Sequence, residues 1–303
     1  MRRIVLGALI AAGAVTMTVR AAQQPAAMVV EVEKLRDNFY VMRGGGGNSG
    51  VFLTAAGVVV VDTKNPGWGK PLLDKIRTVT DKPIKMIINT HTHGDHVSGN
   101  VEFPTVEVVT QENTAKNMET MKTPSGIAPP AGGATNIFKE NSGRNMPKKT
   151  FKDKMTIGSG DERIELRYFG RGHTNGDAWV FFPALRIVQT GDIFSGKNIP
   201  LLDAVNGGSG LEIGKTLEKA YKNLNGADTV ITGHNPNMKP ADLMEYAAFN
   251  QEFAATMQAA KKAGRTVDEM AASWKIPAKY QGYAPPADVR LKSNIQIVFD
   301  ETK

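Results

Sequence analysis

The chain has 303 residues, of which 41% are hydrophobic and 22% charged, a balance typical of a globular protein with a sizeable core. It contains no cysteine, which excludes disulfides, a lipid anchor attached through cysteine, and thiolate ligands for a metal. The formal net charge is +7 and falls by three, to +4, without the three arginines of the first 21 residues. No nucleic-acid-binding motif accompanies this modest charge, so we expect no nucleic-acid partner.

The N-terminus has the pattern of an export signal. Two arginines precede an apolar run from Ile4 to Val19 that is rich in Ala and Gly. This run has the length of a signal-peptide core and is short for a membrane span. Small residues then flank Arg20, so we expect cleavage near Ala21. We therefore predict a signal peptide over residues 1–21 and an exported mature chain, periplasmic or secreted, without a stable membrane anchor; an uncleaved anchor is the alternative.

The next part of the chain alternates between strand and helix patterns. Runs rich in β-branched and aromatic residues predict strands at Met28–Val32, Phe39–Met42, Val51–Leu53, Val58–Val61, Ile84–Ile88, Val106–Val109, Ile164–Phe169, Trp179–Phe182, Ile187–Gln189 and Thr229–Ile231. Helical spacing of apolar residues predicts helices at Pro71–Val79, Gln111–Met121, Gly210–Leu224, Pro240–Ala263 and Val267–Ser273. This order favours one layered α/β domain over residues 22–303 rather than two domains.

Two regions depart from the regular alternation. Residues 112–148 are rich in Pro, Gly, Ala and Ser with few apolar anchors, so we expect an inserted lid, with a plain surface excursion as the alternative. A cluster of lysines from Lys148 to Lys154 is interpreted as a solvated basic face. Residues 239–303 are expected to form a C-terminal helical region. The glycine-rich run Gly44–Gly50 is interpreted as a flexible turn.

The segment from His91 to His96 carries the clearest chemical signal. Its sequence, His-Thr-His-Gly-Asp-His, places three imidazoles and one carboxylate within six residues at the end of a predicted strand. His91 and His93 can reach one ion from a tight loop, whereas Asp95 and His96 point toward a second. Gly94 allows the backbone to turn sharply between the two pairs. The segment therefore predicts a site for two metal ions.

Three further candidate ligands follow, each at the end of a predicted strand. His173, Asp192 and His234 are all preceded by a glycine, as expected where the backbone bends to aim a ligand. With them, all five histidines of the chain fall into one pattern. Imidazole and carboxylate ligands suit two Zn²⁺ ions per chain, and iron and manganese stay open as alternatives.

This pattern resembles the metallo-β-lactamase superfamily, whose HxHxDH motif is matched by His91, His93, Asp95 and His96. The resemblance covers roughly residues 30–235. It implies an α/β fold, an αββα four-layer sandwich with two mixed sheets flanked by helices. By the same resemblance, His91, His93 and His173 hold the first metal, Asp95, His96 and His234 hold the second, and Asp192 bridges them. Asp62, after the strand Val58–Val61, matches a family aspartate that braces the metal loop; a simple strand-end turn is the alternative.

The ligand set predicts a hydrolase acting on a small molecule. Two adjacent dications lower the pKa of a bridging water, and the resulting hydroxide attacks the carbonyl of a small ester, thioester, lactone or amide. Asp95 is the predicted catalytic residue, because its carboxylate can orient the water and take its proton. Lys197 is a candidate for binding a substrate carboxylate, with an ordinary surface lysine as the alternative.

Other functions stay open beside this one. The well-known β-lactamase subclasses of the resembled superfamily have Cys or Ser where this chain has Asp192, yet export to the compartment where β-lactams act keeps β-lactam hydrolysis as the main alternative. A persulfide dioxygenase-like oxidoreductase with one iron ion is a further one. A non-catalytic binding protein is disfavoured, because no ligand of the pattern has been lost. The sequence does not indicate the oligomeric state.

Overall fold

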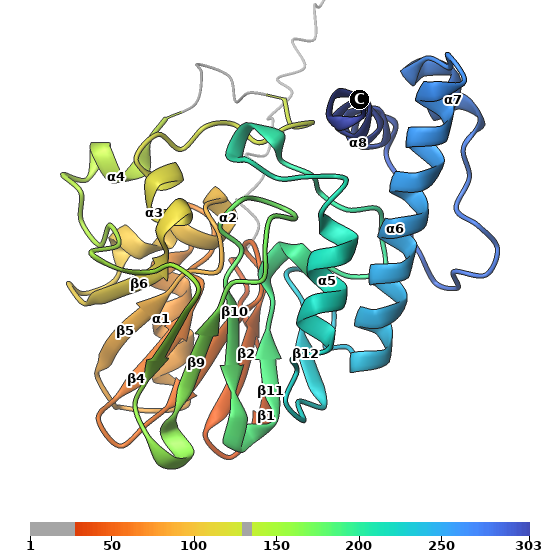
Figure 1. The fold of residues 1–303 in the computed structure, drawn as a ribbon. Coiled ribbons are helices and arrows are strands. Elements are labelled where there is room, and N and C mark those ends of the chain that lie inside the picture. Colours follow the sequence, from red (N-terminus) through yellow and green to blue (C-terminus); the bar gives the residue numbers. More distant parts are fainter. Residues whose placement is uncertain (1–27, 129–134) are drawn as a thin grey trace, which may run out of the picture.

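The computed structural model describes residues 28–128 and 135–303 (Figure 1). The predicted signal peptide, residues 1–21, lies outside these ranges, as does part of the predicted lid. Within the ranges, no helix is both long and apolar enough to cross a membrane.

Two mixed β-sheets form the centre of the molecule. The first contains, in spatial order, β1 (Glu31–Arg36), β2 (Phe39–Arg43), β3 (Ser49–Leu53), β4 (Val58–Val61), β5 (Ile84–Ile88), β6 (Glu107–Gln111) and β7 (Lys149–Phe151). The second contains β12 (Thr229–Ile231), β11 (Ile187–Gln189), β10 (Trp179–Phe182), β9 (Ile164–Arg167) and β8 (Lys154–Ile157). Strands β4 to β7 are parallel, as are β11 and β12, and the other pairs are antiparallel.

Helices lie around the two sheets (Figure 1). They are α1 (Gly69–Arg77), α2 (Gly94–Val97), α3 (Glu112–Met118), α4 (Ile137–Glu140), α5 (Ile213–Tyr221), α6 (Pro240–Lys262), α7 (Val267–Ser273) and α8 (Asp288–Glu301). Helix α1 packs its apolar face on the first sheet through Leu72 and Ile76, and α5 and α6 cover the second sheet. Alternate residues of the two sheets, such as Val59 and Val180, meet in a shared apolar layer between them. The predicted αββα sandwich of two mixed sheets is therefore confirmed.

The strands that carry the candidate ligands end at one edge of this sandwich. Strands β4, β5 and β6 run parallel in the first sheet, and β11 and β12 run parallel in the second. Because carboxyl ends of parallel strands meet at the same edge, the loops that follow them converge. This edge therefore positions the site.

Several elements differ from the sequence-based expectations. The first strand begins at Glu31 rather than Met28, and most of its residues are exposed. Two short strands, β7 and β8, were not expected; they carry Lys149 and Lys154 at the edges of the two sheets, where lysine discourages pairing with another chain. The long helix was expected to end at Ala263 and ends at Lys262. Helix α8 was not delimited within the expected C-terminal helical region.

The segment 112–148 is better anchored than its composition indicates. Phe138 and Met118 are 1% and 0% exposed, and they pack with Val97 and Val101 in a small apolar cluster. Asn145 is also buried, and its side-chain amide donates to the carbonyls of Asn100 and Pro104. The few apolar anchors that the segment has are thus well used in its described parts, because two apolar side chains far apart in sequence share one cluster.

Candidate metal centre

The local backbone explains how one short segment serves two sets of ligands. After β5 the chain bends at residues 90–92, and His93 then caps α2 in an extended conformation with a φ of −67° and a ψ of 144°. Helix α2 then begins at Gly94, so that Asp95 and His96 lie in its single turn. This change from extended to helical backbone sends the first two imidazoles to one side and the next two ligands to the other.

The predicted ligands form two groups of side chains. One group comprises His91, His93, His173 and Asp192, and the other Asp95, His96 and His234; in each group the possible ligand atoms lie within 4.8 Å of one another. His93 Nδ1 lies 3.2 Å from His173 Nε2, so two imidazoles of the first group face each other. All members of the first group are buried, whereas 29% of the Asp95 side chain and 38% of the His234 side chain are exposed. Solvent therefore reaches the site from the side of the second group.

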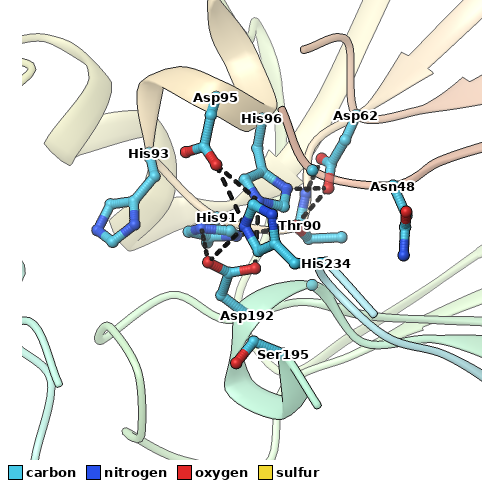
Figure 2. A network of polar contacts seen from close by, with 12 residues as sticks. Asn48, Asp62, Thr90, His91, His93, Asp95, His96, Asp192, Ser195 and His234 are labelled. Carbon is cyan, nitrogen blue, oxygen red and sulfur yellow. Dashed lines mark hydrogen bonds and ion pairs between the residues drawn. The ribbon is translucent and has the colours of Figure 1, made fainter. Parts of the chain in front are cut away.

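Asp192 lies between the two groups (Figure 2). Its Oδ1 is 3.2 Å from His96 Nε2, and its Oδ2 is 3.2 Å from His234 Nε2 and 4.0 Å from His91 Nε2. A side chain at position 233 would collide with this carboxylate, since an added Cβ would lie 1.9 Å from Asp192 Oδ1. The glycine before His234 is therefore required by the close approach of the two ligand loops.

Asp62 connects the end of β4 to the metal-ligand loop. Its backbone has a φ of 61°, a left-handed conformation that is uncommon for a residue other than glycine. Its Oδ1 accepts a hydrogen bond from Thr90 N at 2.8 Å, and its Oδ2 accepts one from Thr90 Oγ1 at 2.7 Å. Asp62 Oδ2 also lies 2.8 Å from His96 Nδ1. The carboxylate thus orients the ring that presents Nε2 to the second group.

The charges of the site divide the imidazoles into two kinds. Burial, together with His96 and His173, lowers the pKa of His91 well below its ordinary value, and burial with His93 lowers the pKa of His173 to about 3. Both rings are therefore neutral at pH 7. Asp192 raises the pKa of His234 to about 9 against the effect of burial. Burial opposes protonation of His96, but Asp192 and Asp95 raise its pKa well above the ordinary value.

The side chains present fit a pair of metal ions. Among the described residues, His91 Nε2 and Asp192 Oδ1 are buried without a hydrogen-bond partner. Buried polar atoms without a partner are costly, and a metal ion supplies what they lack. Nitrogen and oxygen donors in two adjacent groups match the ligands that zinc prefers in proteins.

A comparison with known families agrees with this geometry. A family model described as the metallo-beta-lactamase superfamily matches residues 42–234. The chain belongs to this superfamily. The matched residues contain all seven predicted ligands and both sheets apart from β1 and most of β2.

Individual relatives in the superfamily are distant. A protein named metallo-beta-lactamase type 2 from Elizabethkingia meningoseptica is 26% identical over 221 residues, which cover 68% of this chain and 79% of the relative. A metallo-beta-lactamase from Chryseobacterium indologenes is 23% identical, covering 62% of this chain and 71% of the relative. The solved structure of a metallo-beta-lactamase from Pontibacter korlensis has a TM-score of 0.59 and 22% identity, covering 74% and 99% of the two chains. This likeness shows the fold.

Asp203 is a contact of the metal centre that the sequence did not reveal. Its Oδ2 accepts a hydrogen bond from His93 Nε2 at 2.8 Å, which leaves Nδ1 of that ring directed at the first group. Its Oδ1 accepts one from Ser125 N at 2.9 Å, so the same carboxylate holds the segment 112–148 beside the site. An aspartate outside any motif, 110 positions along the chain from its partner, offers no sequence signal.

The glycine-rich run Gly44–Gly50 is held in place and is not a free turn. Lys64 is fully buried, and its ammonium donates to the carbonyls of Met42 and Gly47 at 2.6 and 2.5 Å. Gly47 N in turn donates to Asp95 O, and Asn48 N donates to Gly233 O. The run therefore links the backbone of Asp95 to that of Gly233, which precedes His234. Asp95 and His234 are both ligands of the second group.

Lys197 has partners inside the protein. Its ammonium lies 3.1 Å from Asp242 Oδ1 and 3.1 Å from Glu245 Oε1, both on α6. The expectation that Lys197 binds a substrate carboxylate therefore has no support, because two carboxylates of the chain already surround the ammonium. A cleft of about 600 Å³ opens instead beside His93, with Met121 and Ile127 in its lining.

Proposed function

We propose that this protein is an exported hydrolase that uses two Zn²⁺ ions to cleave a small ester, thioester, lactone or amide. The observation that carries the proposal is the carboxylate of Asp192 between two groups of ligands. His91, His93 and His173 would hold one ion and Asp95, His96 and His234 the other, with Asp192 shared. When bound, the ions lower the pKa of water and polarise a carbonyl.

The protein's own residues supply the remaining steps. Asp95 lies in the more exposed group, where its carboxylate can accept a proton from the attacking water and orient it. Burial raises the pKa of Asp95, but His96 and His234 together lower it to about 2, so the carboxylate is ionised at neutral pH. The cleft beside His93 has room and apolar lining for a small substrate.

A second candidate, β-lactam hydrolysis, is favoured by the names of the distant relatives. The charge of the site argues for the first candidate. Asp95 and Asp192 offset about half of the four positive charges of two zinc ions, so less remains to stabilise the nitrogen anion that leaves a β-lactam. An alkoxide or thiolate needs less stabilisation, because its conjugate acid, an alcohol or a thiol, is a stronger acid than the amine formed from the β-lactam nitrogen.

The test is a comparison of kcat/KM on zinc-loaded mature protein. A thioester, an activated ester, a lactone, a penicillin and a carbapenem are measured side by side, with Asp95→Ala as the background. We expect the best ester, thioester or lactone to exceed both β-lactams. A β-lactam cleaved at or above that rate would make β-lactam hydrolysis the primary function.

Export is proposed from the sequence of residues 1–21. The mass of the mature N-terminus from a bacterial host with an intact export pathway tests it. We expect a chain trimmed near Ala21, and an intact Met1 on cytosolic protein would contradict export.

A further inference from the structure

Helix α8 supports the first group of ligands from outside the region matched by the family model. Asn294 on this helix donates its side-chain amide to Pro200 O at 2.6 Å and accepts from Leu202 N at 3.4 Å. The carbonyl between these two residues, Leu201 O, contacts Nδ1 of His173. Helix α8 is thus attached to the segment that orients a metal ligand, and its own side chains lie close to the site.

Arg290 lies one helical turn before Asn294, beside the segment at residues 125–126. A Cβ added at Gly126 would lie 3.9 Å from Arg290 Nη1 and 2.8 Å from Ser293, so this segment packs directly on α8. The neighbouring Ser125 N donates to Asp203, which in turn accepts from His93. In Figure 1 the end of this yellow-green segment lies next to α8. A short chain of contacts therefore joins the guanidinium to a metal ligand.

Arg290 makes no direct ion pair among the described residues. Its Nη1 is buried and has no hydrogen-bond partner among the described residues. Every other arginine in the described part of the chain has an ion pair or, for Arg144, a hydrogen bond to a carbonyl. The residues outside the described ranges contain no Asp or Glu that could pair with it. Lys197, by contrast, has two carboxylate partners.

The surroundings of Arg290 make this unpaired charge costly. The residue is half-buried, and burial lowers its pKa from the usual value, while the carboxylates of Asp192 and Asp203 raise it. A guanidinium nevertheless stays charged in proteins. A charge without a direct partner in a partly desolvated position costs free energy that a bound anion would recover.

We propose that Arg290 binds an anionic group of the substrate, a carboxylate, and so selects substrates that carry a negative charge near the scissile carbonyl. A guanidinium matches a carboxylate with two parallel hydrogen bonds. The inference rests on the proposed hydrolase function and adds the substrate class to it. Arg290 takes the role that the sequence suggested for Lys197.

The experiment uses a matched pair of esters on zinc-loaded mature protein. One is 4-nitrophenyl hydrogen glutarate, and the other is its methyl ester, which has the same leaving group and no charge. The readout is the ratio of kcat/KM for the charged ester to that for the neutral ester. We expect Arg290→Gln to lower this ratio about tenfold to hundredfold, the scale of a lost charge-assisted hydrogen bond. Arg290→Lys keeps the charge without the planar fork and should lower the ratio less.

The control is Arg77→Gln, which removes an exposed guanidinium on α1 and should keep the wild-type ratio. Glutarate binding, measured by calorimetry on the same zinc-loaded proteins, gives a second readout, and we expect it to weaken at least about tenfold in Arg290→Gln. If no ester is cleaved but glutarate binding depends on Arg290, the proposed hydrolysis fails and the binding inference stands. Wild-type ratio and wild-type glutarate affinity in Arg290→Gln, at equal zinc content, would overturn the inference.

Discussion

Asp192 is the residue on which the two-ion arrangement depends, because its two oxygens lie near ligands of both groups. We expect Asp192→Ala to retain less metal and to lose at least about a hundredfold in turnover, the scale of losing one central electrostatic element. Metal analysis and kcat/KM on the purified variant measure both effects. Asp37→Ala, which removes an exposed carboxylate, is the control. A variant with normal metal content and activity would remove Asp192 from the site.

Lys64, which is not among the predicted metal ligands, gives the fold a pH dependence of its own. Burial lowers the pKa of its ammonium from 10.5 to about 7. Between these values the unfolded chain binds a proton that the folded chain lacks, so the lysine's contribution to the free energy of unfolding decreases as pH falls from about 10 to about 7. Below pH 7 both states are protonated and the loss is complete.

The Lys64→Met variant has no ammonium that titrates. The free energy of unfolding of the wild type minus that of the variant should therefore decrease as the pH falls from about 10 to about 7. Denaturant unfolding of chelator-treated protein at three pH values measures it. Lys85→Met, at an exposed position, is the matched control. If the difference in free energy of unfolding were the same at every pH, burial would not shift the pKa of this ammonium.

At the residue scale the sequence was informative where ligands cluster. The hexapeptide from His91 to His96 and the three later strand ends pointed to all seven side chains that the structure brings together. The sequence did not reveal the roles of Asp203, Lys64 and Arg290. Asp203 and Lys64 act on partners that are distant in the chain, and Arg290 has no direct partner among the described residues. Their roles depend on the packing of whole elements, which no local pattern encodes.

Helix α4 and the end of α3, both within the segment 112–148, pack this segment against the helix that carries two metal ligands. Phe138 packs in the same cluster as Val97, which directly follows His96. We expect Phe138→Ala to lower the free energy of unfolding by about 3 kcal/mol or more, as for other buried aromatic truncations. We also expect faster hydrogen exchange in residues 136–146 and weaker zinc retention. Unchanged exchange would show that the cluster does not hold this segment.

The elements that the sequence predicted best have a clear apolar run or a clear helical spacing of apolar residues. Strands β4 and β5 and helix α6 were placed to within about one residue because their apolar runs or spacing are unambiguous. Strands β7 and β8 have only three and four residues and contain lysines, so the local sequence signal for a strand is weak. They form strands because they pair with neighbouring strands in the sheets. Helix α8 did leave a signal, since Leu291, Ile295 and Val298 recur at helical spacing and are buried.

On the scale of the whole molecule, the metal-ligand groups span two sheets that also meet through apolar packing and through hydrogen bonds such as Asn48 N to Gly233 O. His91 to His96 follow the first sheet, whereas His173, Asp192 and His234 belong to the second. In a chain without cysteine, bound ions would be the only cross-links between these halves within the described residues.

Metal analysis of protein purified without chelator should therefore give about two ions per chain. Removing them should lower the melting temperature by roughly 10 °C, since ligands that bind only the folded state contribute several kcal/mol. Calorimetry before and after chelation, followed by zinc addition, measures the loss and its recovery. A stoichiometry that stays at one under zinc excess would contradict the two-ion arrangement.

The residue proposed to select the substrate, Arg290 on α8, and the residues proposed to hold the metals lie in different parts of the chain. Changes in substrate preference and changes in metal binding can therefore arise from different mutations. All seven ligands lie within residues 91–234 on the strand-end loops, whereas Arg290 lies on a helix that packs against them from beyond the matched region. With the role proposed for Arg290, mutations in the C-terminal helices would alter which substrates are accepted while the metal ligands stay intact. Laboratory evolution restricted to α8 and the loop before it should yield variants with new preferences and undiminished metal content, which makes this helix the natural place to diversify the enzyme.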